Sequence, residues 1–237
     1  TSARFGSRCP ICMEEWDVNV PGALLICCCV MVCDSCANKL HQNNSCPLCR
    51  SPPTRSDAEY LARLRRHVEK EVPEAIGVLA DCYKGGVYGL VKSEKKAAKL
   101  YKRAVELGDL DSMVHLGVLY ANGAGGVNLD KKKAMQLYRI AADRGHATAQ
   151  YNLGQKLREE GSPEEAVVYY TRSARQGYAL AEYNLGVAYA QGHGAEFDVD
   201  EAIRWMKRAA AKGAEGAAVA LAEIESFRDR LGRFLEK

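Results

Sequence analysis

The sequence has few Phe and Trp residues and little net charge, and it has no long hydrophobic segment. Its 237 residues include only 4 Phe and 2 Trp, and 33 basic residues nearly balance 30 acidic ones, which leaves a net charge of +3. That balance provides no strong field for a polyanion, and 47% apolar residues at such low net charge exclude bulk disorder. The longest apolar run, Ala23 to Cys33, has eleven residues, about half of what a bilayer-spanning helix needs.

A secretory signal is missing as well. Glu14, Glu15 and Asp17 precede the apolar run, where a signal peptide would carry basic residues. We therefore expect an intracellular, cytoplasmic protein without a membrane segment. The chain starts at Thr1 rather than Met, which leaves room for an upstream segment.

Cysteine is the residue with an unusual distribution. Nine of the ten cysteines lie between Cys9 and Cys49, and the tenth is Cys82. They form three C-x-x-C pairs and one run of three, namely Cys9/Cys12, Cys33/Cys36, Cys46/Cys49 and Cys27-Cys28-Cys29. A C-x-x-C turn brings two thiolates to one ion in the tetrahedral geometry of zinc, whereas a disulfide scaffold would need a secreted context. About fifty residues bury too little apolar surface to fold alone, so bound zinc would be part of folding.

The order of these cysteines resembles that of the RING finger, in which eight ligands bind two structural zinc ions in a cross-braced order. The resemblance implies a first zinc ion on Cys9, Cys12, Cys33 and Cys36, and a second on Cys46, Cys49 and two of the three clustered cysteines. The commonest family pattern has a His where this chain has Val30. We take Cys27 and Cys28 as the missing ligands. Cys29 in place of either is the first alternative, and His41 is a remote one.

The same resemblance implies ubiquitin ligation by docking of a ubiquitin-charged conjugating enzyme (E2). The family positions that line the E2 groove are occupied by Ile11, Leu40, Pro47 and Leu48. Arg50 follows the last ligand, at the position that bridges E2 and ubiquitin, and its guanidinium fork can bond carbonyls on both. No covalent intermediate forms on a RING, so its catalytic contribution is orientation of the thioester. Many active members have Trp where this chain has Leu40, which favours a narrower choice of E2 or an inactive module.

Residues 73 to 213 form a repeat with a period near 36. Small residues at one register, Ala80, Gly117, Gly154 and Gly186, are 37, 37 and 32 residues apart. Each unit has a second small-residue pair seven apart, Ala97/Ala104, Ala134/Ala141, Ala166/Ser173 or Ala202/Ala209, and closes at Gly108, Gly145, Gly177 or Gly213. Ser93, Asp130, Ser162 and Asp198 are suitable N-caps for a second helix, and the closing glycines suit its left-handed C-cap. Ser162, Pro163 and Glu165 also predict a capping box.

This helix–loop–helix pattern resembles Sel1-like repeats, relatives of tetratricopeptide (TPR) repeats, over about 140 residues. The resemblance implies an all-α solenoid whose concave face binds proteins, and residues 214 to 237 supply the terminal cap that such arrays need. We expect Tyr83, Tyr120 and Tyr189, which share a register, to pack between helices rather than to line a ligand site. The glycine-rich loops 85–89 and 123–127 are predicted to be turns, because no Gly-Lys-Ser/Thr sequence follows them.

Residues 51 to 72 lie between the two modules. Ser51-Pro52-Pro53-Thr54 predicts a stiff connector, and a helix is predicted after it, capped by Ser56 with Glu59 and stopped by Pro73. A small basic cluster on this helix, Arg63, Arg65, Arg66 and His67, is diluted by acidic residues. We interpret it as a solvated face rather than a nucleic-acid site.

The sequence therefore predicts a small zinc-stabilised RING finger (residues 1–50), a linker with a short helix (51–72) and an all-α Sel1-like/TPR-like solenoid with a C-terminal capping helix (73–237). The expected function is that of a RING-type E3 ubiquitin ligase, whose partners are an E2, ubiquitin and a protein substrate held by the repeats. The alternative is a non-catalytic adaptor with a structural two-zinc module. Catalysis by zinc itself is excluded for all-Cys, four-coordinate sites, because they leave no open position for water.

Overall fold

The computed structural model describes residues 23–25, 30–32, 46 and 54–235. They belong to two compact units, residues 1–137 and 138–237. The predicted all-α repeat architecture after residue 54 is confirmed, because every regular element there is a helix.

Two short strands lie in the apolar run of the N-terminal module. Strand β1 (Ala23–Leu25) pairs antiparallel with β2 (Val30–Val32) in the register Ala23 to Val32, Leu24 to Met31 and Leu25 to Val30. The connection between them, residues 26–29, contains the run of three cysteines and lies outside the described residues.

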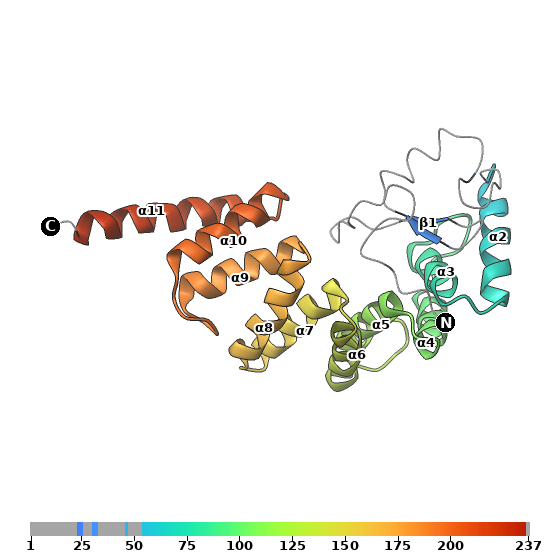
Figure 1. Cartoon of the computed structure of the whole chain (residues 1–237). Helices are drawn as coiled ribbons and strands as arrows, with labels where there is room; N and C mark the ends of the chain where they lie inside the picture. Colours follow the sequence, from blue (N-terminus) through green and yellow to red (C-terminus); the bar gives the residue numbers. More distant parts are fainter. Residues whose placement is uncertain (1–22, 26–29, 33–45, 47–53, 236–237) are drawn as a thin grey trace. The chain divides into compact units, whose positions relative to one another are not determined.

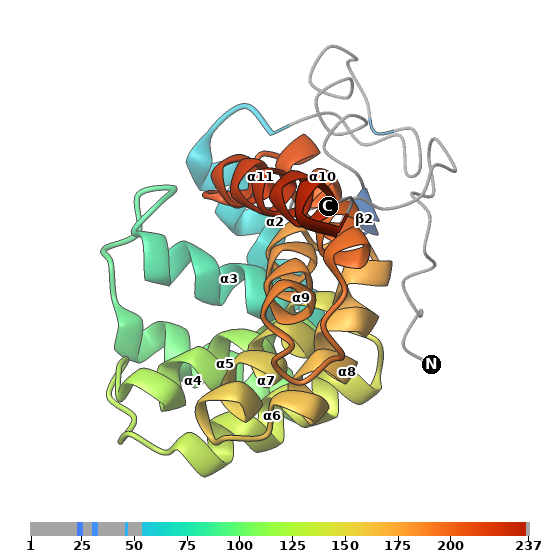
Figure 2. The same cartoon turned by 90° about the vertical axis from the view of Figure 1, so that its left-hand side faces the viewer.

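A series of helices follows, shown in Figure 1 in chain order. They are α2 (Asp57–Glu69), α3 (Pro73–Gly85), α4 (Glu94–Glu106), α5 (Leu110–Asn122), α6 (Lys131–Asp143), α7 (Ala147–Glu159), α8 (Pro163–Arg175), α9 (Ala179–Gln191), α10 (Val199–Ala211) and α11 (Ala217–Leu235). Each repeat consists of a first helix (α3, α5, α7 or α9) and a second helix (α4, α6, α8 or α10). Figure 2 shows such a pair, α3 and α4, joined by a long loop.

The small residues that define the repeat are its most deeply buried positions. Ala75, Ser112, Ala149 and Ala181 in the first helices are 0% exposed, and the seven-apart pairs of the second helices are at most 1% exposed. Because their side chains are short, the helix backbones can approach closely at these points, which is why the repeat is visible in the sequence.

The predicted helix ends are largely confirmed. The side chains of Ser93, Asp130 and Asp198 accept backbone N–H bonds at 3.3, 2.9 and 2.9 Å from the third residue after each. The closing glycines have φ between +72° and +93°, the left-handed region that glycine adopts without strain. The capping box at Ser162 is wrong: Pro163 opens α8 as expected, but the Ser162 side chain makes no capping bond. Its ψ of 66° falls short of the extended conformation of Ser93 and Asp198 (ψ 95° and 106°).

Helix α2, predicted as a helix in the linker, packs as the first helix of the array. Leu61 and Leu64 form one buried cluster with Ala75, Leu79 and Cys82 of α3. Ser56 caps α2 and Ser93 caps α4, and these two N-caps are 37 residues apart. Glu71 has a positive φ of +56° after α2, as the closing glycine Gly108 has after α4, and these two residues are also 37 apart. Helix α2 thus occupies the place of a second helix in a partial repeat that precedes Pro73.

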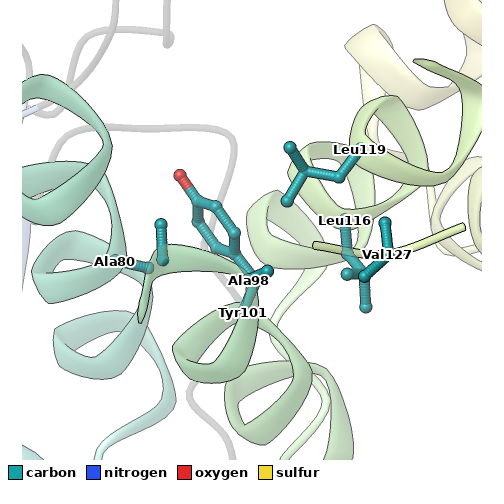
Figure 3. Close-up of a cluster of buried hydrophobic side chains, with 7 residues drawn as sticks. Ala80, Ala98, Tyr101, Leu116, Leu119 and Val127 are labelled. Carbon is teal, nitrogen blue, oxygen red and sulfur yellow. The ribbon is translucent and has the colours of Figure 1, made fainter. Parts of the chain in front are cut away.

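The apolar core of the first unit continues between the first two repeats. Ala80, Ala97, Ala98, Tyr101, Leu116, Leu119 and Val127 form one buried cluster. In Figure 3, Leu119, Leu116 and Val127 lie on one side of the Tyr101 ring and Ala80 on the other. Val127 belongs to the glycine-rich loop after α5 and anchors that predicted turn in the core, whereas Gly123 and Gly126 of the loop are exposed.

The long loops cross the N-terminus of the preceding second helix. A Cβ atom on Gly125 would lie 3.2 Å from the carbonyl oxygen of Glu94 in α4, and one on Gly194 would overlap the carbonyl oxygen of Pro163 in α8. Both glycines also have positive φ. The first long loop makes the corresponding contact through Tyr88, whose ring stacks on Tyr60 of α2 with centroids 4.1 Å apart.

Candidate functional site

The zinc and E2-docking residues predicted from the sequence lie almost entirely outside the described residues. This holds for Ile11, Leu40, Pro47, Leu48, Arg50 and for the cysteines at positions 9, 12, 27, 28, 29, 33, 36 and 49. Cys46 is the exception, and it is 8% exposed. A buried Cys is consistent with a structural ligand, and thiolate donors in this number suit zinc. Within the described part of the chain no three His, Cys, Asp or Glu side chains gather as a metal site.

The remaining cysteine is of a different kind. Cys82 lies in α3, 3% exposed, within the core shared with α2. Burial, with a smaller effect of Asp81, raises the pKa of its thiol to about 11. Cys82 therefore stays a protonated core residue at neutral pH and is no candidate zinc ligand.

The basic cluster on α2 is mixed with acid, as expected for a solvated face. The Arg63 guanidinium lies 2.6 Å from a Glu59 carboxylate oxygen, one turn away. The other Glu59 oxygen accepts the backbone N–H of Arg55 at 2.8 Å. These two bonds are the main reason that the pKa of Glu59 is lowered. Glu59 therefore stabilises the N-terminus of α2.

A partly exposed polar group of three residues joins the first two repeats. The Tyr101 hydroxyl of α4 donates to Asp81 of α3 at 2.5 Å, and His115 of α5 lies 3.6 Å from the same Asp81 oxygen. The Tyr101 and His115 rings stack with centroids 5.2 Å apart. Burial, followed by the bond to Asp81, raises the pKa of Tyr101. This tyrosine is therefore a permanent donor that joins three successive helices.

Asp109, the residue before α5, is an unusual buried acid. It is 8% exposed, and it accepts the backbone N–H of Ser112 at 2.8 Å as the N-cap of α5. Burial, together with the nearby acids Asp111 and Glu74, raises its pKa to about 6, against the opposing bonds from Ser112. Gly77 of α3 provides the space, since a Cβ there would lie 3.0 Å from the Asp109 carboxylate.

The second unit has a buried carboxylate held by two cations. Glu182 of α9 is 0% exposed, and one of its oxygens lies 2.8 Å from Arg208 and 2.9 Å from Lys212. Lys212 also donates to the carbonyl oxygen of Gly177 at 2.6 Å. The group ties α9 to the end of α10, so its role is to fix successive helices.

The recurring tyrosines pack between helices as predicted, at least where the contacts are described. Tyr83 and Tyr120 are half-buried against the cores. Lysines lie over their outer faces: Lys96 is 5.1 Å from the Tyr83 ring centre, and Lys133 is 5.4 Å from that of Tyr120. Tyr189 is half-buried as well.

Comparison with known families accounts for both modules. The model of the Sel1 repeat matches residues 73–109, 110–146, 147–178 and 179–213, more than half of the chain. The chain belongs to the Sel1 repeat family. The model of the C3HC4-type RING zinc finger matches residues 6–56. This Sel1 repeat protein therefore carries an N-terminal RING-type zinc finger, which implies zinc binding.

Solved Sel1 repeat structures share the array but not the whole chain. A protective antigen of uropathogenic Escherichia coli, c5321, is 27% identical with a TM-score of 0.67, over 75% of this chain and 38% of its own. A Sel1 repeat protein from Oxalobacter formigenes is 29% identical with a TM-score of 0.63, over 70% of this chain and 66% of its own. The immunity protein Pa5087 of Pseudomonas aeruginosa, at 22% identity and a TM-score of 0.51, shares the fold. No curated protein matches the chain significantly.

The buried polar groups of the array were not found by sequence reasoning. In the sequence Asp109 and Glu182 look like ordinary acids at a helix start and on a helix face, because their burial depends on neighbouring helices.

None of the described helices is long and apolar enough to cross a membrane. Stacked repeats of the Sel1 type form an extended surface, which suits protein–protein interaction.

Proposed function

We propose that the protein is a RING-type E3 ubiquitin ligase that docks a ubiquitin-charged E2 on its zinc module and recruits protein substrates through the Sel1 repeats. The observation that carries the proposal is the RING match over residues 6–56 joined to a Sel1 array. By resemblance to the RING family, we assign Ile11, Pro47 and Leu48 to the E2-docking positions, and Arg50 follows the last cysteine.

Two zinc ions hold this module together in the proposal. The first is bound by Cys9, Cys12, Cys33 and Cys36, and the second by Cys46, Cys49 and two residues of the run Cys27-Cys28-Cys29. When bound, zinc supplies the cross-links that replace a hydrophobic core in a module of this size. The protein's side chains position the partners: the apolar groove docks the E2, and the Arg50 guanidinium donates hydrogen bonds to both the E2 and ubiquitin.

The packing of α2 supports a close coupling of the two modules. Since α2 is part of the array's core, the connector runs only from Arg50 to Ser56, the N-cap of α2. Six residues span at most about 22 Å even when fully extended. A substrate held on the first repeats would therefore stay within a limited distance of the docked E2, which raises its effective concentration at the thioester.

Autoubiquitination of the full, zinc-loaded chain against a panel of E2 enzymes tests the proposal. We expect ubiquitin chains with at least one E2. Arg50→Ala should reduce the rate by about tenfold or more, because it removes charge-assisted hydrogen bonds to two partners. Cys12→Ala should abolish activity with loss of zinc. Arg65→Ala, on an exposed position of α2, should retain full activity.

A non-catalytic adaptor is the second candidate. Leu40 favours it, because a Leu in place of the family's usual Trp reduces the contact area for E2. If protein with bound zinc and intact helices forms no ubiquitin chains with any E2, the function is assigned to the repeats alone.

A further inference from the structure

Helix α11 continues the register of the first helices. Three of its residues stand 36 positions after the residues that define this register in α9: Ala217 after Ala181, Leu221 after Leu185, and Ala222 after Gly186. Ala217 and Ala181 are both 0% exposed. Helix α11 therefore has the place of a first helix in a fifth, partial repeat. Within the described residues no second helix follows it.

In the fourth repeat the second helix α10 covers the corresponding face of α9. A Cβ atom on Gly186 would lie 3.0 Å from Met206 of α10. Glu182, one turn earlier, is 0% exposed and bonded to side chains of α10. In α11 these two positions are occupied by Ala222 and Ala218, and both are exposed. The side of α11 that would receive a second helix is therefore open.

A shallow hollow of about 590 Å³ follows this open side. The residues that line it define what we call the α11 face, and they are Ala218, Val219, Ala222, Glu223, Ser226 and Arg230. The α10 helix packs along α11 (Figure 1). Three of the six residues are apolar, and Val219 is 65% exposed. A helix that ends a repeat array usually has a polar outer face, so the α11 face is more apolar than a terminal cap requires.

The charges on the α11 face complement each other under a two-fold rotation. Glu223 and Arg230 are seven residues, or about two turns, apart. Arg230 donates to the Ser226 hydroxyl at 3.1 Å, and among the described residues neither charge has an ion-pair partner. Asp229, the exposed acid beside them, is already paired with Arg228 at 3.2 Å. A two-fold axis between positions 226 and 227 of two antiparallel α11 helices places each Glu223 opposite the Arg230 of the other helix.

We propose that the α11 face is a dimer interface, on which α11 of a second copy packs antiparallel about a two-fold axis near Ser226. The α11 helix of the second copy takes the place of the missing second helix, and an antiparallel orientation is also that of helices joined by short connections, such as α7 and α8. The short side chains of Ala218 and Ala222 let the two backbones approach closely. The interface is isologous, so both ion pairs form at once.

The size of this interface sets the strength of the dimer. Helix α11 has 19 residues, which gives a length of about 28 Å. A single pair of such helices buries less surface than a standard protein–protein interface, so we expect a dissociation constant in about the micromolar range. The proposal goes beyond the ligase function and requires neither E2 nor ubiquitin.

Sedimentation equilibrium of the zinc-loaded full chain, from about 1 µM to about 300 µM, tests the proposal. We expect a monomer–dimer equilibrium. Ala222→Arg places a long charged side chain in the middle of the α11 face and should leave the chain monomeric. Ala62→Arg makes the same change at an exposed position of α2 and should retain native dimerisation. Both positions are exposed and helical, so the circular dichroism and melting temperature of the dilute variants should match those of the native monomer.

Reversal of the two charges tests the antiparallel geometry. Glu223→Arg or Arg230→Glu alone brings like charges together at two symmetric places, and should weaken dimerisation about tenfold. The double variant exchanges the charges and should restore the native dissociation constant. A chain that is monomeric at every concentration would overturn the proposal and leave the α11 face to a helix of a different protein. A dimer that persists in Ala222→Arg, or that the exchange does not restore, would also overturn it. Because no E2 or ubiquitin is present, the result is independent of the autoubiquitination test.

Discussion

A Cβ atom on Gly154 of α7 would lie 2.7 Å from Cε1 of Tyr170 in α8. The tyrosine ring thus lies directly on the glycine, with the backbone of Ala166 3.2 Å away on the same side. Gly186 has the same relationship to Met206, with a closest distance of 3.0 Å. In these repeats the glycine is needed for the close approach of the residue opposite it, and not for a turn.

Gly154→Ala should destabilise the protein in spite of the higher helix propensity of Ala. The added methyl overlaps a buried ring and a backbone carbonyl, so we expect a loss of about 1–3 kcal/mol. Gly85→Ala is the matched control, because a Cβ at that helical position would meet only Val87, at 3.5 Å. Urea unfolding measures both; a Gly154→Ala variant as stable as the native chain would contradict the close packing.

The burial of Asp109 predicts a dependence of stability on pH. Its pKa is raised to about 6 from an ordinary value of 3.8, so the folded protein holds the proton more tightly than the unfolded chain. The resulting stability is fully present below about pH 4 and is lost as the pH rises through about 6. Asp109→Asn keeps the cap but cannot ionise, and should be more stable than the native chain by about 1–3 kcal/mol at pH 7.

Unfolding by urea at a series of pH values between 4 and 7 checks this prediction. The free energies of unfolding of the native protein and of Asp109→Asn should become equal toward pH 4 and differ increasingly above it. Asp130→Asn makes the same chemical change at an exposed N-cap, and its free energy of unfolding should depend on pH as that of the native protein does. A native protein that gains stability relative to Asp109→Asn on going to pH 7 would disprove the assignment.

The two cations on Glu182 should matter far more than an exposed ion pair. Replacing both Arg208 and Lys212 by Met leaves a fully buried carboxylate without a charge partner, and should cost about 3 kcal/mol or more. Arg204→Met breaks the exposed pair with Glu201, in which Arg204 is 69% exposed, and should cost less than about 1 kcal/mol. Thermal unfolding of the three proteins compares them; equal losses would show that Glu182 is solvated in solution.

Metal content distinguishes the cysteines of the two modules. We expect two zinc ions per chain by metal analysis, and Cys46→Ser should lose one of them. Cys82→Ala should lose none, because that thiol is buried among α2 and α3. After chelation the repeats should keep a strongly helical circular dichroism, since no predicted ligand lies in them. A content near one zinc ion would exclude the cross-braced arrangement, and a mainly β spectrum would exclude the solenoid.

Much of the array could be predicted from the sequence because its signals are local. Small residues seven positions apart, N-cap side chains and closing glycines act within a few residues of their own position, so Ser93, Asp198 and Gly108 could be assigned correctly. Ser162 shows the limit of such rules. Ser162, Pro163 and Glu165 match the capping-box sequence, but the backbone angle ψ at Ser162 decides whether its side chain can accept the capping hydrogen bond. Helix α2 was predicted as a helix, whereas its place in the core depends on Leu61 and Leu64 meeting α3.

The sequence by itself determined the two modules, the period of the repeat and the residues that cap its helices, because each depends on spacing along the chain. Tertiary structure decided which polar groups are buried and what they meet. Tyr101 and Tyr170 occupy the same register, yet only Tyr101 finds an acid, because the residue facing it across the helix pair is Asp81 rather than Gln155. Partners of this kind are set by side chains twenty or more residues apart, which only the packing of successive helices brings together.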